Sequence, residues 1–488
     1  MAKFSSVIKI FLFTFFLIFF YTVSQGQVNW TMEGSVDGSN HGNNHPRITM
    51  DAAGNPVLIW FNAGSVRFSR WHNGEFESSK ILNPSITAAG ASWMGPDIAA
   101  HGDTIYVVFK EVPEDVGHIW CLHSFDAGET FSDPVRVDFT ADSLSRFPTV
   151  TTDASGHPVI AFMKFDQGFS NARWVVTRSN DFGNSFLPDV LASGWSSPTS
   201  HVCDCCPGAI SSFGNNVVVL YRDNNNNIRD TWAALSTDGG MSFAEGINID
   251  LKNWEIHACP SSGPDGVIIG DTLYSTFMNG ASGTSRVYTN QTSLSDFKSL
   301  PGTLVTGSLP GSSQQNFPRI SSSDNTVAVV WKQYLNDNDQ CLLSFTSDIT
   351  SGILPVFDTV ATSGVFNSDI AIHNGNIIVV WEDYNSGTVE FRWGTYEVTT
   401  GTEEVRNESL HVFPNPSPDA WTLNGHDIIQ GSKIEVCDIS GQIVYRKVLQ
   451  DNFNVSLFEI DNTGWSSGIY FLKITHGNTI NGLKLVKF

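Results

Sequence analysis

The chain of 488 residues is long enough for several domains, and its hydrophobic content of 41% excludes a disordered protein. Charged residues make up only 16%, against about 25% in an average soluble protein, while glycine occurs 42 times and aromatic residues reach 12%. The 27 basic and 49 acidic side chains give a net charge of −22, which excludes nucleic acid and anionic membrane surfaces as general partners.

The first residues have the pattern of a secretory signal peptide, predicted over residues 1–26. Lys3 and Lys9 provide a positive start, Ile10–Val23 is uncharged and rich in Phe, and Ser24–Gly26 supplies small residues for cleavage. No cysteine follows the cleavage point, which argues against a lipid anchor. No later segment is apolar for long enough to cross a bilayer, so we expect an exported protein without a transmembrane segment.

A repeat of about 50 residues runs from 27 to 398 and predicts an all-β propeller. Its clearest part is a short apolar strand that ends in a bulky residue. The copies are Val57–Phe61, Ile105–Phe109, Val159–Met163, Val217–Tyr221, Leu273–Phe277, Val327–Trp331 and Ile377–Trp381. Another short strand begins before each copy, at Pro46, Pro96, Pro148, Pro207, Pro264, Pro318 and Ser368. The pattern favours seven blades, with six as the alternative.

A second motif, S-x-D-x-G-x-[ST]-aromatic, recurs with the same spacing of about 50 residues. Its copies are Ser124–Phe131, Ser179–Phe186 and Ser236–Phe243. The aspartate is suited to accept hydrogen bonds across a tight turn, and the glycine to adopt a positive φ. On these motifs the chain resembles the sialidase-type propellers, whose Asp-boxes join the third and fourth strands of a blade. We expect the aspartates to be structural.

Four cysteines are expected to lie close together at the start of blades 4 and 5. They belong to the segments His201–Pro207 and Trp254–Pro260, which we place beside Tyr221–Asp230. The CDCC, YRD…IRD and W-x-I-x-x-C-P patterns resemble a group of bacterial sialidase-like proteins. Three interpretations remain open for the candidates: two disulfides (a vicinal Cys205–Cys206 bond among the arrangements), a copper or zinc site, or a thiol nucleophile. The candidates are Cys203, Cys205, Cys206, Cys259, His201 and His257.

The other cysteines, Cys121, Cys341 and Cys437, are too widely separated to pair and are predicted to be buried free thiols. No cofactor is otherwise expected.

After a polar linker, predicted at 399–409, the composition changes to alternating strands with glycine turns over 410–488. These residues predict a small β-sandwich. Leu410–Pro416, Ile434–Tyr445 and Gly468–Ile474 resemble the C-terminal sorting domain of the type IX secretion system. The resemblance implies that the type IX machinery is a partner and that the protein is secreted or displayed on the surface of a Gram-negative bacterium. A carbohydrate-binding β-sandwich is the alternative.

Loops on the face opposite the Asp-boxes are where a binding site is expected, because rigid scaffolds carry sites on loops. The repeat places two sets of residues around this channel mouth. Those beside the blade starts are Arg47, Asp97, Thr149, Gly208, Asp265, Arg319 and Asp369. Those that end the second strands are Asn62, Lys110, Lys164, Arg222, Met278, Lys332 and Glu382. The cations predict an anionic ligand such as an acidic glycan, unless they pair with neighbouring carboxylates.

The resemblance to sialidases implies three arginines on the substrate carboxylate, a Tyr–Glu nucleophile and an aspartate acid. Carried onto this chain, the candidate catalytic residues are Asp97, Arg47, Arg222, Arg319 and Glu255. The candidate substrate-binding residues are Lys110, Lys164, Arg229, Asp230, Lys332 and Trp254. For the Tyr–Glu pair the loose candidates are Tyr221 or Tyr334 with Glu255 or Glu382, and Tyr221 also fits core packing. Sialidases usually have six blades, which weakens the transfer of their activity.

Three functions therefore remain open. The first is a sialidase-like glycoside hydrolase (or a lyase) acting on acidic glycans. The second is a non-catalytic surface propeller that binds glycan or protein. The third is a metal- or redox-linked protein that uses the cysteine cluster.

Overall fold

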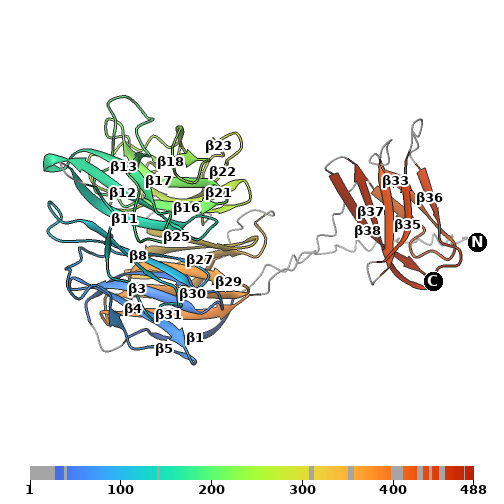
Figure 1. Ribbon diagram of the computed structural model, residues 1–488, viewed down its shortest axis with the longest axis horizontal. Helices are drawn as coiled ribbons and strands as arrows, with labels where there is room; N and C mark the ends of the chain where they lie inside the picture. The colour runs from blue at the N-terminus through green and yellow to red at the C-terminus, as the bar shows by residue number, and fades with distance from the viewer. Residues whose placement is uncertain are drawn as a thin grey trace, which may run out of the picture. The chain divides into compact units, whose positions relative to one another are not determined.

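The computed structural model describes residues 28–37, 41–139, 143–306, 313–349, 357–396, 410–425, 432–438, 442–449, 457–476 and 479–488. The chain divides into two compact units after Val398 (Figure 1). The predicted signal peptide and linker lie outside the described residues.

The first unit consists of seven antiparallel sheets, which confirms the predicted propeller. Each sheet is one blade, and strands follow one another outward from its first strand. Blade 1 contains β2 Asn43–Met50, β3 Pro56–Asn62, β4 Ser65–His72, β5 Glu75–Phe76 and β6 Lys80–Ile81. Blade 2 contains β7 Asp97–His101, β8 Thr104–Lys110, β9 Ile119–Ser124 and β10 Val135–Arg136. Blade 3 contains β11 Leu144–Thr152, β12 Pro158–Asp166, the 3₁₀ turn η1 Gln167–Phe169, β13 Ser170–Arg178 and β14 Val190–Leu191.

The remaining blades repeat this pattern. Blade 4 contains β15 His201–Val202, β16 Ala209–Phe213, β17 Asn216–Asn224, β18 Thr231–Ser236 and β19 Glu245–Asn248. Blade 5 contains β20 Asp265–Ile269, β21 Thr272–Asn279, β22 Arg286–Ser293, β23 Lys298–Ser299 and β24 Thr303–Leu304. Blades 6 and 7 contain β25 Gln314–Ser323, β26 Thr326–Leu335, β27 Asn338–Thr346 and β28 Phe357–Ala361; and β29 Val365–His373, β30 Asn376–Asp383, β31 Thr388–Thr395 and β1 Asn29–Ser35.

The repeated apolar segments are the second strands of the blades, and both of their faces are buried. Successive side chains of a strand point to opposite faces, so Val57 and Ile59 pack toward blade 2 while Leu58 and Trp60 pack toward blade 7. The same division recurs around the unit and produces seven hydrophobic clusters, one between each pair of neighbouring blades. A continuous apolar run is therefore required in each second strand.

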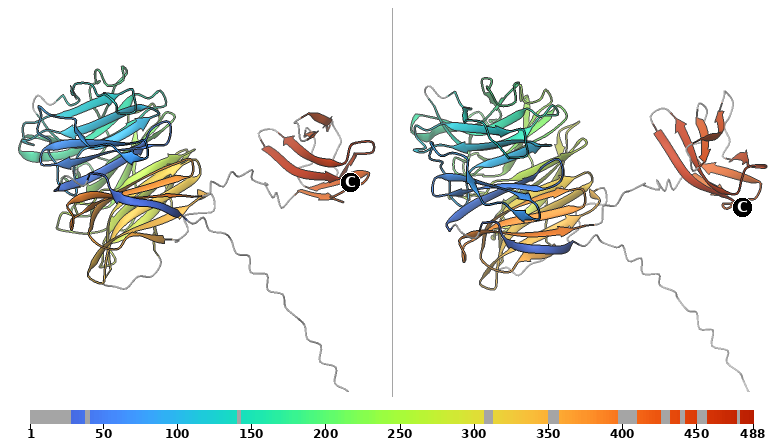
Figure 2. Two further views of the ribbon diagram at one scale, coloured as in Figure 1. Left: turned by 90° about the horizontal axis from the view of Figure 1, so that it is seen from below. Right: turned by 60° about the horizontal axis from the view of Figure 1, so that its bottom comes forward.

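The ring closes through the two ends of the unit. The first strands of neighbouring blades contact one another in order, and β29 of blade 7 contacts β2 of blade 1. Blade 7 takes its outermost strand from the N-terminal end, because β1 pairs with β31 (Figure 2). The chain thereby covers an edge that would otherwise expose unpaired backbone groups.

The Asp-box motifs form the turns between the third and fourth strands of blades 2, 3 and 4, as predicted. In the first, Asp126 accepts hydrogen bonds from Ser124 Oγ at 2.7 Å, from Thr130 N at 2.9 Å and from Thr130 Oγ1 at 2.6 Å. These bonds hold the pKa of Asp126 at about 2, against the opposing effect of partial burial. Asp181 and Asp238 bond their own turns in the same way.

The glycine of the first Asp-box allows blades 1 and 2 to approach closely. Gly128 has a φ of 82°, and a Cβ placed there would lie 2.2 Å from Cζ of the buried Phe68. We expect Gly128→Ala to lower the free energy of unfolding by about 1–3 kcal/mol more than Gly214→Ala. Gly214 is the matched control, because it has a φ of 59° and nothing within 4 Å of an added Cβ. Urea unfolding of both variants checks this, and equal losses would contradict it.

The second unit is a two-sheet β structure. One sheet contains β32 Leu410–Phe413, β33 Ala420–Gly425 and β36 Leu457–Asp461; the other contains β34 Lys433–Asp438, β35 Ile443–Val448, β37 Gly468–His476 and β38 Thr479–Lys487. Their facing side chains form a single core around the fully buried Trp421.

Candidate functional site

A cavity opens where the first strands of the blades begin, and every blade of the propeller contributes to it. We call it the axial cavity. Its volume is about 50 Å³, and it is open to solvent on one side. Its lining comprises His45, Arg47, Trp93, Met94, Gly95, Asp97, Phe147, Pro148, Thr149, Pro207, Gly208, Gly263, Pro264, Phe317, Pro318, Arg319 and Asn367. It lies on the face predicted to carry the site.

Three of the first strands carry the same strained bulge at this cavity. His45, Phe147 and Phe317 each precede a proline and have φ values of 52°, 51° and 49°. The register of the strand pair shifts at each of these positions. A bulge redirects a side chain, and all three residues line the axial cavity. Bulky residues rarely adopt a positive φ, and such strain concentrates at functional sites.

Arg47 and His45 are the buried cationic and imidazole groups on the blade 1 side of the cavity. Arg47 Nη1 donates to Pro46 O at 2.7 Å and to Asn367 Oδ1 at 3.4 Å. Among the described residues, no carboxylate lies within 4 Å of its guanidinium. Burial lowers the pKa of Arg47 to about 10, and Arg319 contributes to this. Arg47 therefore remains charged at neutral pH.

His45 is held as a neutral group. Burial and the nearby Arg47 lower its pKa well below the ordinary value. His45 Nδ1 lies 3.4 Å from Ser92 O, so Nδ1 is the nitrogen that carries the proton when this bond forms. Nε2 is then the proton acceptor of the ring.

Arg319 has a different environment, because two buried carboxylates share its guanidinium. Arg319 Nε lies 2.9 Å from Asp369 Oδ1 and 3.3 Å from Asp265 Oδ2. Each carboxylate also accepts a backbone N–H of the next blade: Asp265 from Ile320 at 3.0 Å and Asp369 from Ile48 at 2.9 Å. Asp265 and Asp369 therefore join neighbouring blades, and Arg319 neutralises both of them.

Asp97 occupies the same position in blade 2 and makes the same inter-blade bond. Its Oδ2 accepts hydrogen bonds from Val150 N at 3.1 Å and from Thr149 Oγ1 at 2.7 Å. Asp97 also lines the axial cavity. The candidate catalytic acid thus has a structural task, although it lies where the sequence placed it.

None of the predicted second-strand ends lines the axial cavity, and the three lysines among them have partners near their own strands. Lys164 pairs with Asp189 at 2.8 Å and Lys332 with Asp339 at 3.0 Å. Lys110 donates to Gly117 O, and burial lowers its pKa to about 8. Lys332 instead lines a separate cavity with Ser285, Gln314, Asn316, Phe317, Tyr334 and Asp339. Lys164 and Lys332 are therefore paired with carboxylates, as the alternative interpretation held in general form, whereas Lys110 bonds a backbone carbonyl.

Arg222 was also predicted to bind ligand, but it does not line the axial cavity. It is buried, and its guanidinium donates to Arg229 O at 2.6 Å, Met278 O at 2.6 Å and Ser262 O at 3.5 Å. Trp254 stacks on it, with 5.2 Å between Arg222 Cζ and the ring centroid. These contacts leave Arg222 out of the axial cavity and join blades 4 and 5.

The remaining candidates in this region are also structural or exposed. Asp230 is buried and accepts the backbone N–H groups of Asn253 and Trp254, both at 2.9 Å. Glu255 is exposed and lies 3.4 Å from His257, outside the axial cavity, so its predicted catalytic role has no support in the geometry.

The candidates for a Tyr–Glu nucleophile do not form such a pair in the axial cavity. Tyr221 is fully buried in the core, and Tyr334 bonds to Asp337 at the surface. Glu382 accepts bonds from Ser92 and from the backbone of His45.

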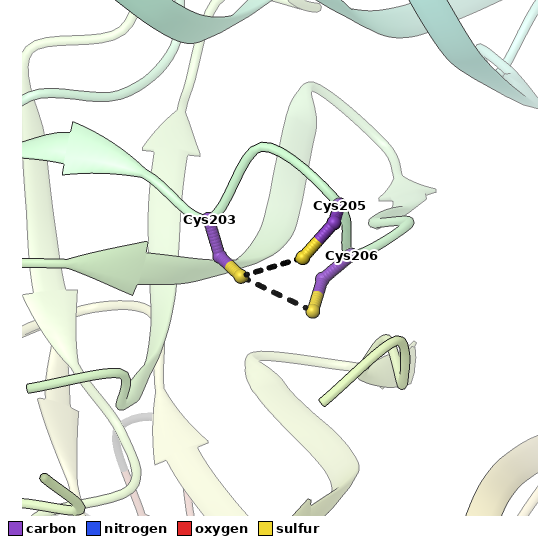
Figure 3. Close-up of side chains that lie close together, drawn as sticks. All are labelled: Cys203, Cys205 and Cys206. Carbon is purple, nitrogen blue, oxygen red and sulfur yellow. Dashed lines mark hydrogen bonds between the residues drawn. The ribbon is translucent and has the colours of Figure 1, made fainter. Parts of the chain in front are cut away.

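The predicted cysteine cluster does form, with one disulfide where two were expected. Cys205 is bonded to Cys259, while Cys203 and Cys206 are free and buried. Cys203 Sγ lies 3.3 Å from Cys206 Sγ and 3.5 Å from Cys205 Sγ (Figure 3). The sulfurs of Cys203, Cys205 and Cys206 all lie within 4.8 Å of one another. The disulfide, however, uses one of them, and Arg229 Nη1 contacts Cys203 Sγ at 3.0 Å.

Neither histidine of the cluster adds a metal ligand among the described residues. His201 and His257 are exposed and lie outside the group of three sulfurs. The vicinal Cys205–Cys206 bond does not form, because Cys205 pairs with Cys259. Of the other cysteines, Cys121 and Cys341 are buried free thiols as predicted, whereas Cys437 is only half-buried.

His45, Trp93 and Asn367 line the axial cavity but were not among the predicted site residues. The predicted residues follow each blade-starting proline, whereas His45 precedes one. The recurring X-Pro step was the available signal for His45, Phe147 and Phe317. Trp93 and Asn367 had no comparable signal.

The C-terminal unit matches a known family over residues 411–487, described as "Secretion system C-terminal sorting domain". This unit is a sorting domain. The sorting domain directs the chain to the type IX secretion machinery, so the protein is secreted or displayed on the cell surface. None of the residues that the structure describes belongs to a helix with the length and apolar character needed to cross a membrane.

An ulvan lyase of Nonlabens ulvanivorans, NLR42, is 28% identical over 97 residues, which is 20% of this chain and 17% of the lyase. This chain therefore spans less than a fifth of that relative's length.

Solved structures of similar fold include three glycan-active enzymes. They are a PL25 ulvan lyase (TM-score 0.47, 10% identity, 76% of this chain and 94% of that one), the Fusarium graminearum α-L-arabinofuranosidase Arb93A (0.43, 13%, 67% and 99%) and the Trypanosoma rangeli sialidase (0.42, 11%, 91% and 84%).

Proposed function

We propose that the propeller recognises acidic glycans outside the cell by binding a sugar carboxylate or sulfate at Arg47 in the axial cavity. The observation that carries this proposal is the buried Arg47 guanidinium, which lines the cavity and has no carboxylate within 4 Å among the described residues. A guanidinium is suited to bind such oxyanions through paired hydrogen bonds.

The rest of the lining supports a sugar as the ligand. Trp93, Phe147 and Phe317 supply apolar and aromatic surface, while Thr149 and Asn367 supply polar groups. The three strained bulges also fit a site that must hold its side chains in a set arrangement.

Sialidase-like hydrolysis is the finer form of the proposal, and the cavity offers it less support. Of the described residues that line the cavity, Asp97 alone carries a carboxylate. Glycosidases usually need two carboxylates, or a tyrosine in place of one. His45 is the other proton-transfer group, and an imidazole beside a bound uronate is also compatible with elimination. Binding without cleavage is therefore the second candidate function.

One experiment tests both levels. The purified protein is titrated calorimetrically with sialylated, uronate and sulfated oligosaccharides, and the mixtures are analysed by mass spectrometry. We expect an acidic glycan to bind and Arg47→Ala to weaken binding about 10- to 100-fold, the usual range for a charged hydrogen bond. Lys298→Ala is the matched control, because it removes one positive charge from an exposed pair on β23.

The outcomes separate the alternatives. Unsaturated products indicate elimination, saturated products with new reducing ends indicate hydrolysis, and an intact bound glycan indicates a binding protein. Equal affinities of wild type and Arg47→Ala, or binding of neutral glycans alone, would overturn the proposal.

A further inference from the structure

The four clustered sulfurs of blades 4 and 5 combine a dithiol and a disulfide within reach of each other. Cys203 and Cys206 are 0% and 1% exposed, whereas Cys259 of the Cys205–Cys259 bridge is exposed. None of the four lines the axial cavity. The cluster is therefore a separate chemical feature that glycan recognition does not use.

Cys203 has the surroundings of a nucleophilic thiol. It begins a C-x-x-C pattern with Cys206, a spacing common in redox-active pairs. The hydrogen bond from Cys206 and the positive charges of Arg229 and Arg222 lower the pKa of Cys203 to about 6, although burial opposes them. Burial raises the pKa of Cys206, so once Cys203 is deprotonated the proton between the two sulfurs, 3.3 Å apart, belongs to Cys206.

We propose that these four cysteines form one thiol–disulfide exchange site, in which Cys203 attacks Cys205 Sγ across the 3.5 Å gap (Figure 3). In the first step the Cys203–Cys205 bond forms, the Cys205–Cys259 bond breaks, and Cys259 leaves as a thiolate. In the second step deprotonated Cys206 attacks Cys203 Sγ and Cys205 leaves as a thiolate. The proton lost by Cys206 passes to one of the released thiolates.

The exchange needs no external oxidant, because one disulfide and two thiols are present before and after it. Its effect is to move an electron pair from a buried dithiol to a dithiol that includes the exposed Cys259. A soluble thiol or disulfide of small size can then react at Cys259, while Cys203 and Cys206 remain shielded. The site thereby connects a protected couple to the medium outside the cell.

A metal ion held by Cys203, Cys205 and Cys206 is the competing use of this cluster. The structure favours exchange, because the bond to Cys259 removes Cys205 from a ligand set and the described histidines lie outside the group. A structural zinc site usually has four ligands.

The test uses full-length secreted protein carrying Cys206→Ser, in which the serine hydroxyl can still donate to Cys203 and the second step is blocked. The protein is incubated in its native state with excess N-ethylmaleimide, digested without reduction and mapped by mass spectrometry. We expect Cys259 to become alkylated while a Cys203–Cys205 bond accumulates. In the matched control, Cys203→Ser with Cys206→Ser, alkylation of Cys259 should be at least about tenfold slower.

The rate adds a second readout. The positive charges of Arg229 and Arg222, which the variant retains, lower the pKa of Cys203, so alkylation of Cys259 at saturating reagent should level off at a lower pH than for an ordinary thiol. An ordinary exposed thiol would show a rate that rises to about pH 8.5.

Three results would overturn the proposal. One is a Cys205–Cys259 bond that survives equally in both variants while each retains the circular dichroism spectrum of the wild type. Another is an alkylation rate that rises with the pH profile of an ordinary thiol. The third is stoichiometric zinc or copper in the isolated wild-type protein together with reduced Cys205 and Cys259. Cys341→Ser, which removes a distant buried thiol, should behave as the wild type.

Discussion

Arg319→Met is expected to lower the free energy of unfolding by about 3–5 kcal/mol at neutral pH. The methionine retains much of the side-chain volume but removes the cation between Asp265 and Asp369, which are 7% and 4% exposed. Two buried carboxylates would then lose the guanidinium that lies between them, and Arg47 would remain as the nearby positive charge. Both also bond to the neighbouring blade, so the loss should weaken closure of the ring.

The pH dependence of this variant distinguishes electrostatics from packing. Burial already raises the pKa of Asp265, and Arg319 opposes that rise. Without the arginine, the carboxylates should hold protons to higher pH in the folded than in the unfolded state. Stability then falls as pH rises above the unfolded value of about 4.

Urea unfolding at pH 5 and pH 8 measures the effect. The variant should be closer to wild type at pH 5, and Asp265→Asn in the same background should restore part of the loss. A deficit below about 1 kcal/mol, equal at both pH values, would contradict this account of Arg319.

Arg222→Ala is expected to lower the free energy of unfolding by about 3 kcal/mol or more. The substitution leaves the carbonyls of Arg229, Met278 and Ser262 without their donor, and an unpaired buried acceptor costs about 1–3 kcal/mol. It also removes the stacking of the guanidinium on Trp254.

Arg173→Ala is the control for Arg222→Ala, because Arg173 forms a partly exposed ion pair with Asp166 at 3.0 Å. Such a pair contributes about 0–1 kcal/mol. Thermal and urea unfolding compare the two. Arg222→Ala should also disturb the sulfur cluster, because Arg222 holds the backbone of Arg229, whose side chain contacts Cys203. A stable Arg222→Ala protein would instead restore Arg222 as a ligand-binding candidate.

Arg47, Arg222 and Arg319 looked equivalent in the sequence, but the structure gives them different roles. Arg222 and Arg319 are used to hold blades together, which leaves Arg47 as the cation of the axial cavity for an anionic ligand. Arg47 provides this positive charge in a protein whose net charge is −22.

The propeller, its Asp-box turns and the sorting domain could all be predicted from the amino-acid sequence. Two buried faces require continuous apolar second strands, and tight turns require glycine and aspartate, so both constraints repeat visibly along the chain. The same regularity predicted that blade starts meet at one cavity, and it brought Cys203, Cys205, Cys206 and Cys259 together correctly.

Which charges are available to a ligand, and which strand edges are covered, depends on how the blades pack together in three dimensions. The partner of β31 is β1, from the opposite end of the unit, and no local pattern records that pairing. Lys164 and Lys332 point to Asp189 and Asp339, while Arg222 finds three carbonyls, because a buried charge takes the nearest group that can compensate it. Such partners are set by distances across blades, which spacing along one strand does not contain.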